Sequence, residues 1–124
     1  MRDVSFPVEV IDGVPVLAAP EEIDITNAVG LRAALGQAAG NGHETLVVDL
    51  TRTRFCDSAG MHALVDAHKR ARADGGQVLL AVSGTAVPRI LEITGIDRML
   101  PRFGSVAEAL ACLPAAGTPG PPPG

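Results

Sequence analysis

An abrupt change of hydrophobic pattern between residues 46 and 71 constrains the fold of this chain more than any other feature. The apolar run Leu46–Leu50, rich in β-branched residues, predicts a buried strand. Beyond Ser58 the apolar residues take a helical spacing and form one stripe: Met61, Leu64, Val65, His68 and Ala71. A strand that gives way to a helix in so short a segment is typical of an α/β protein.

Ser58 falls at or next to the N-terminus of this expected helix. Free backbone N–H groups and the positive end of the helix dipole point outward at such a place. A phosphate group can be accepted there without unfolding the helix. The alternative interpretation is that Ser58 only caps the helix with its hydroxyl oxygen.

The chain opens with two short apolar segments, Phe6–Val10 and Val14–Ala18. The dipeptide Asp12-Gly13 between them predicts a β-hairpin, because both residue types tolerate positive φ in a tight turn. Pro15 has no N–H to donate to a neighbouring strand. Its presence indicates that the second strand lies at an edge or pairs on one side only.

The remaining apolar spacing predicts four helices, the first after Asp24 or Thr26 as candidate caps and ended at Gly40. The second is the Ser58 helix. Downstream we expect a strand at Gln77–Val82, a helix at Val87–Ile93, a short strand within Ile96–Leu100 and a last helix at Ser105–Leu113. Ser105 and Glu108 have the spacing of a capping box for that last helix.

This order predicts an α/β fold with one domain over residues 1–113. We expect a mixed, mostly parallel sheet of about four to five strands, an N-terminal antiparallel hairpin and about four packed helices. The Pro- and Gly-rich segment 114–124 contains no core-forming residue and is expected to be a disordered tail.

Composition excludes several classes of function. The chain has 124 residues, a formal net charge of −4 and no dense basic stripe, so direct binding to nucleic acid is not expected. No apolar run approaches the roughly 20 residues of a membrane span. The N-terminus lacks the apolar core of a signal peptide, and we expect a cytoplasmic location.

The candidate catalytic residues do not form a convincing active site. The segment Cys56–Gly60 matches only the second glycine of a nucleophile elbow around Ser58. His62 lies one helical turn beyond Ser58, a spacing that rarely aims an imidazole at the hydroxyl of a helix-start serine. We therefore expect no enzyme activity, and a solvated or partner-facing role for His62.

Cofactor and metal sites are also not expected. The two cysteines, Cys56 and Cys112, are far apart in sequence without metal-ligand spacing, and we expect both to be small buried residues. The chain has no phosphate-binding loop of the G-x-x-x-x-G-K type.

Two short motifs resemble a known family. The segment Asp57-Ser58-Ala59-Gly60-Met61, after a strand ending in Asp49-Leu50, resembles the signature of the STAS domain family, and more narrowly that of bacterial anti-sigma-factor antagonists. The segment Glu22–Ala28 is similar to the acidic segment before the first helix of that family. The resemblance extends from about Phe6 to Leu113 and implies a single STAS-like domain.

The resemblance implies a partner-switching function. In the family, the serine matching Ser58 is phosphorylated by a kinase of the GHKL type that is also the anti-sigma factor and carries ATP and Mg²⁺ on its own chain. A phosphatase reverses the modification. The resemblance also places the aspartate matching Asp24 near that serine. The expected partner-binding residues are Asp24, Asp57, Ser58, Ala59, Gly60, Met61 and His62.

Alternatives remain for individual residues and for the whole chain. Asp57 could be a helix cap, part of the recognition surface, or both. Gly60 could be required only because another part of the chain approaches closely. The chain as a whole could be a STAS scaffold or sensor module of another signalling complex, or a nucleotide- or small-molecule-binding domain.

Overall fold

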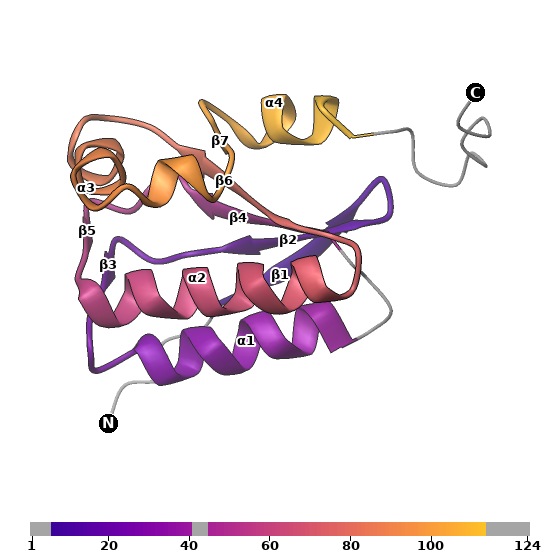
Figure 1. The fold of residues 1–124 in the computed structure, drawn as a ribbon, viewed down its shortest axis with the longest axis horizontal. Coiled ribbons are helices and arrows are strands. Elements are labelled where there is room, and N and C mark those ends of the chain that lie inside the picture. The colour runs from indigo at the N-terminus through magenta and orange to yellow at the C-terminus, as the bar shows by residue number, and fades with distance from the viewer. Residues whose placement is uncertain (1–5, 41–44, 114–124) are drawn as a thin grey trace.

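Strands and helices alternate along the chain as the sequence pattern predicts (Figure 1). The computed structural model describes residues 6–40 and 45–113. The strands are β1 (Val8–Ile11), β2 (Val14–Ala18), β3 (Glu22–Ile23), β4 (Leu46–Leu50), β5 (Phe55–Cys56), β6 (Val78–Val82) and β7 (Arg102–Phe103). The helices are α1 (Ala28–Gly40), α2 (Ser58–Ala73), α3 (Ala86–Thr94), the 3₁₀ turn η1 (Ile96–Arg98) and α4 (Val106–Ala111).

The main sheet has five strands in the order β1-β2-β4-β6-β7. β1 and β2 are antiparallel, whereas the pairs β2-β4, β4-β6 and β6-β7 are parallel. β3 and β5 form a separate parallel pair. The predicted α/β class, the mixed sheet with its N-terminal hairpin and the four helices are therefore confirmed.

The opening hairpin turns at Asp12 and Gly13, whose φ angles are 52° and 80°. Two consecutive positive φ angles are typical of a type I′ turn, and the predicted hairpin is confirmed. The edge position suggested by Pro15 is wrong, because β2 lies between β1 and β4. Its one-sided pairing is confirmed: Pro15 is opposite Val10 of β1, while pairing with β4 begins only at Val16.

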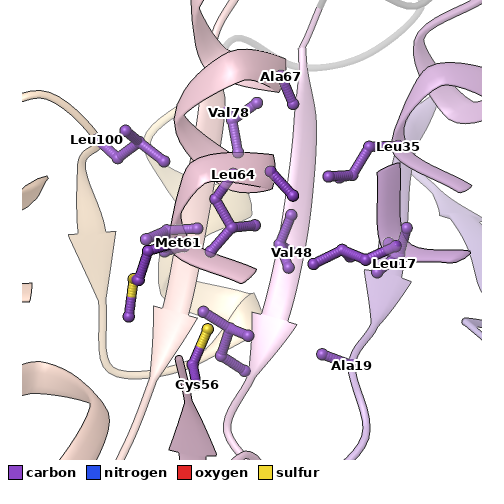
Figure 2. Packing of buried hydrophobic residues seen from close by; sticks show 14 of the residues in the cluster. Leu17, Ala19, Leu35, Val48, Cys56, Met61, Leu64, Ala67, Val78 and Leu100 are labelled. Atoms are coloured by element: carbon purple, nitrogen blue, oxygen red, sulfur yellow. The ribbon is translucent and has the colours of Figure 1, made fainter. Parts of the chain in front are cut away.

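The core lies on both faces of the sheet, because successive side chains of a strand point to opposite faces. Leu17, Val48 and Val78 belong to a large cluster that also includes buried residues of α1, α2 and α3. Figure 2 shows Leu64 and Ala67 of α2 among these strand residues. Val47 and Leu79 face the other way and pack with Ala109 of α4. The alternation of β4 and β6 therefore fixes which helices cover each face.

The short strand expected within Ile96–Leu100 is wrong. Gly95 ends α3 with a φ of 79°, and the chain continues as η1, where the Leu100 N–H donates to the Ile96 carbonyl at 2.9 Å. This helical turn brings the side chain of Leu100 into the core. The last strand is instead β7, which pairs with β6 two residues later.

The predicted capping box at α4 is confirmed in a shifted form. The Glu108 N–H donates to the Ser105 hydroxyl oxygen at 3.1 Å, and the Gly104 N–H donates to the Glu108 carboxylate at 3.2 Å.

Cys56 is buried as expected, but Cys112 is exposed. Cys112 is the residue that follows α4, beyond the turn whose Ala109 reaches the core.

Some expectations lie outside the described residues, among them the disordered tail at 114–124 and the residues before Phe6. In the part of the chain that the structure describes, no helix has the length and apolar character needed to cross a membrane.

His68 is a buried polar residue on the apolar stripe of α2. The Val78 N–H donates to its Nδ1 atom at 3.1 Å, which requires that nitrogen to be unprotonated. Burial, with a smaller contribution from the positive charge of Arg72, lowers the pKa of His68 from its ordinary value of 6.5. The folded protein therefore favours the neutral imidazole.

We expect the free energy of unfolding to fall as the pH drops below the ordinary His pKa of 6.5, because the unfolded chain then binds a proton that folded His68 rejects. The free energy of unfolding should stop falling once the pH is below the lowered pKa that His68 has in the folded protein. Above 6.5 the neutral forms predominate in both states, so His68 gives no slope there. Urea titrations at several pH values measure this, with His68→Asn as the control that keeps an acceptor but cannot titrate. Identical pH slopes for the two proteins would contradict the assignment.

Candidate functional site

Ser58 is the first residue of α2, and the residue before it caps the helix. Asp57 Oδ1 accepts hydrogen bonds from the N–H groups of Ala59 and Gly60 at 3.0 and 3.2 Å. The interpretation of Ser58 as the cap is therefore wrong. Ser58 is exposed, and its hydroxyl makes no hydrogen bond to any residue that the structure describes. The hydroxyl is free to react with, or to contact, another molecule.

Asp57 also joins α2 to the segment before α1. Its second oxygen, Oδ2, accepts a hydrogen bond from the Ile25 N–H at 3.1 Å. The Asp57 N–H donates to the Ile23 carbonyl at 3.0 Å, which continues the pairing of β3 with β5. One carboxylate thus holds three backbone N–H groups from two separate segments.

Asp24 holds a tight turn of its own beside this junction. Its Oδ1 atom accepts from the Thr26 N–H at 2.9 Å and from the Thr26 hydroxyl. These two hydrogen bonds lower the pKa of the Asp24 carboxyl. Neither Asp24 nor Thr26 is the helix cap: Ala28 is the first residue of α1, so the cap position belongs to Asn27, whose side chain accepts from the Asp24 N–H at 2.9 Å.

Gly60 and Met61 lie beneath the surface that carries Ser58. Met61 is 3% exposed. A Cβ atom on Gly60 would lie 2.6 Å from Ile23 Cγ2 and 2.7 Å from Cys56 Sγ. The close-packing explanation of Gly60 is confirmed, because only a glycine lets α2 approach β3 and β5 this closely.

Gly60→Ala should therefore destabilise the protein, by about 1–3 kcal/mol, since the added methyl has to displace a branched side chain and a buried thiol. The matched control is Gly36→Ala in α1, where an added Cβ meets nothing within 4 Å. There the better helix propensity of alanine should stabilise the protein by up to about 1 kcal/mol. Chemical denaturation of the two variants should give changes of opposite sign. A stabilising Gly60→Ala would refute the packing argument.

Cys56 is not a reactive thiol in this arrangement. Burial, with a smaller contribution from the neighbouring Asp57 charge, raises the pKa of its thiol to about 12. The thiolate is the nucleophilic and metal-binding form, so Cys56 acts as a core residue. Within residues 6–40 and 45–113, no three His, Cys, Asp or Glu side chains gather into a group that could hold a metal ion.

A groove of about 420 Å³ lies beside Ser58, between α2 on one side and α3 with η1 on the other. Asp57, Ser58 and His62 contribute its polar groups. Its remaining lining is mostly apolar, with Met61, Val65, Ile90, Ile96 and Met99 as the large side chains. The sequence analysis did not predict this groove. Its two walls, α2 and the α3–η1 segment, are separated in the chain by β6, and no local pattern connects them.

The structure thus brings together most of the predicted site. Asp24, Asp57 and Ala59 are partly exposed, Ser58 and His62 are exposed, and the contact of Asp57 with Ile25 links the two predicted motifs. Chemically, the arrangement presents an unengaged hydroxyl on a polar surface beside an apolar groove.

The sequence is similar to a known domain family and to known proteins. The model of the STAS domain family matches residues 5–109. Anti-sigma-F factor antagonist RsfB of Mycobacterium tuberculosis is 30% identical over 110 residues, which cover 86% of this chain and 88% of that protein.

Solved structures show the same fold. An anti-sigma factor antagonist from Mycobacterium paratuberculosis superposes with a TM-score of 0.80 at 29% identity, over 87% of this chain and 92% of that one. The unphosphorylated form of the anti-sigma factor antagonist SpoIIAA has the same fold, with a TM-score of 0.74 at 20% identity over 87% and 95% of the two chains. The relatives named here are anti-sigma factor antagonists, and the chain belongs to the STAS domain family.

Proposed function

We propose that this protein is an anti-sigma-factor antagonist that works by partner switching in the cytoplasm. The unphosphorylated protein binds an anti-sigma factor, which is a kinase of the GHKL type, and so releases a sigma factor. The kinase uses its own ATP and Mg²⁺ to phosphorylate Ser58, and the modified protein dissociates. A phosphatase restores the binding form. This chain is the substrate of that chemistry and supplies no catalytic group.

One observation carries the proposal: the motif serine is exposed at the first position of α2 with an unengaged hydroxyl. A serine that only stabilised the helix would direct its oxygen to the N–H groups that Asp57 binds instead. The similarity to RsfB and to the mycobacterial antagonist structure supports the same conclusion.

Electrostatics explains how phosphorylation would end the complex. A phosphate adds about −1.5 to −2 charges at neutral pH. The N–H groups of Ala59 and Gly60 already bind the Asp57 carboxylate, so the phosphate on Ser58 is directed outward and lies beside that carboxylate. A doubly charged phosphate about 8 Å from a carboxylate of the partner would be opposed by roughly 1–4 kcal/mol. That opposition weakens binding about fivefold to several hundredfold.

The direct test is to incubate the protein with a purified anti-sigma kinase of the GHKL type from the same organism, with ATP and Mg²⁺, and to map the product by mass spectrometry. We expect one phosphate, on Ser58, and none on Ser58→Ala. The other exposed hydroxyls, such as Ser83 and Thr85, serve as internal controls. Phosphate on a different residue, with Ser58→Ala modified like the wild type, would rule the proposal out.

Asp24 should act on the partner more than on the fold. Asp24→Asn keeps an oxygen that can accept from Thr26 and removes the charge, so we expect the melting temperature to stay within about 2–3 °C of wild type. We expect the KM for phosphorylation, or the Kd for the kinase, to change at least threefold. Thermal melts and phosphorylation kinetics measure the two effects. Wild-type kinetics in a folded variant would remove Asp24 from the proposed partner surface.

A further inference from the structure

Large apolar side chains are exposed unevenly over this protein. In the described residues, those at the end of the molecule that carries Ser58 are Ile25, Val29, Phe55, Ile93 and Met99. Figure 1 shows why they gather there: the start of α1, the start of α2, β5 and α3 all lie at that end. At the edge strand, Val8 and Val10 are the others. Exposed apolar residues concentrated around one polar site indicate a contact surface.

The groove beside Ser58 is the concave part of this surface. Two of its polar lining groups are already bonded within the chain: the Thr94 hydroxyl donates to the Ile90 carbonyl at 2.7 Å, and Asp57 accepts three N–H groups. The other two, Ser58 and His62, are exposed residues of α2 at the edge of the groove. Water in the apolar part of the groove would gain few hydrogen bonds there. An apolar occupant would lose none. The groove volume of about 420 Å³ exceeds the roughly 150 Å³ in which an apolar cavity can hold benzene.

We infer that this groove binds a large apolar side chain of the anti-sigma kinase and so anchors the kinase next to Ser58. The inference rests on the proposed function. Ser58 and His62 form one rim of the groove, so a kinase that brings its γ-phosphate to the Ser58 hydroxyl must also cover the groove. The residues that dominate an interface are typically large side chains that fill a pocket on the partner and exclude water from it once the complex forms.

Two variants alter the groove from its α3 and η1 side without touching Ser58. Met99 is 45% exposed, and Met99→Glu places a charge over the groove. Thr94 is exposed, and Thr94→Phe fills the groove with a bulky ring. Val10→Glu is the matched control, an equally drastic change at an exposed apolar residue of β1 near the Asp12-Gly13 turn.

We expect both groove variants to raise the Kd for the same anti-sigma kinase at least tenfold in calorimetry, about 1.4 kcal/mol, with the control within twofold. Their KM for Ser58 phosphorylation should rise and their kcat should change little. Wild-type affinity in both folded variants would overturn the inference while the proposed function stands. The inference also fails if the variants change only self-association in analytical ultracentrifugation. A wild-type protein that does not bind the kinase at all would instead reject the proposed function.

Discussion

Ser58→Glu should leave the protein folded and should weaken its binding to the anti-sigma kinase at least tenfold. Ser58 is exposed in the first turn of α2, where an acidic side chain suits the helix dipole, so little stability is at risk. Asp57 already occupies the first free N–H groups, so the added carboxylate points outward. It would place a permanent negative charge where phosphorylation places one. Calorimetry with the purified kinase measures the affinity, and circular dichroism reports the fold.

Two further substitutions separate charge from size. Ser58→Gln introduces a side chain of nearly the same shape as Ser58→Glu but without the charge. We expect it to bind the kinase more tightly than Ser58→Glu does. Ser58→Ala should remain in the complex, because it can neither receive a phosphate nor repel the partner. Equal weakening by Gln and Glu would assign the effect to size, and wild-type affinity for a folded Ser58→Glu would contradict the charge mechanism itself.

The sequence predicted the fold wherever a local pattern extended over several residues. Asp12-Gly13 predicted the hairpin turn, because only a few residue types adopt two consecutive positive φ angles. The apolar run at β4 and the stripe on α2 predicted their elements, because each repeats its period several times. The capping box of α4 was also predictable, because it depends on two residues at a fixed spacing, Ser105 and Glu108.

The errors fall where no period exists or where distant segments meet. β3, β5 and β7 have two residues each, too few to show an alternation. The apolar residues Ile96 and Leu100 could belong to a strand or to one helical turn, and the positive φ of Gly95 selects the turn. The groove depends on tertiary packing of α2 against α3 and η1, so the site's polar half was predictable and its apolar half was not.

The cap of α2 is the most instructive of these differences. Asp57 and Ser58 are both good capping residues, and spacing alone does not decide between adjacent candidates. In the structure Asp57 is the cap, so the two neighbouring residues have different roles. Asp57 supplies the hydrogen bonds that start the helix, so Ser58 has no structural task and its oxygen stays available. A modification of Ser58 therefore need not disturb the helix that presents it.

Asp57→Ala should consequently be among the most damaging surface substitutions in this protein. It removes the cap of α2, worth about 0.5–2 kcal/mol, and the acceptor of the Ile25 N–H, worth about 0.5–1.5 kcal/mol. We expect a loss of about 2 kcal/mol in the free energy of unfolding and a fall in the melting temperature of roughly 8 °C or more. Hydrogen exchange of the Ile25 amide should accelerate together with that of Ala59 and Gly60.

Asp57→Ser tests whether one carboxylate serves both segments. A serine at this position can still cap α2, but its shorter side chain has a single oxygen and does not reach the Ile25 N–H as well. We therefore expect protected amides at Ala59 and Gly60 and a rapidly exchanging amide at Ile25. Because Ile25 adjoins Asp24, phosphorylation of Ser58 should also slow in this variant, although the helix that carries the serine stays intact. Equal protection of the Ile25 amide in wild type, Asp57→Ser and Asp57→Ala would show that the turn before α1 holds its position without Asp57.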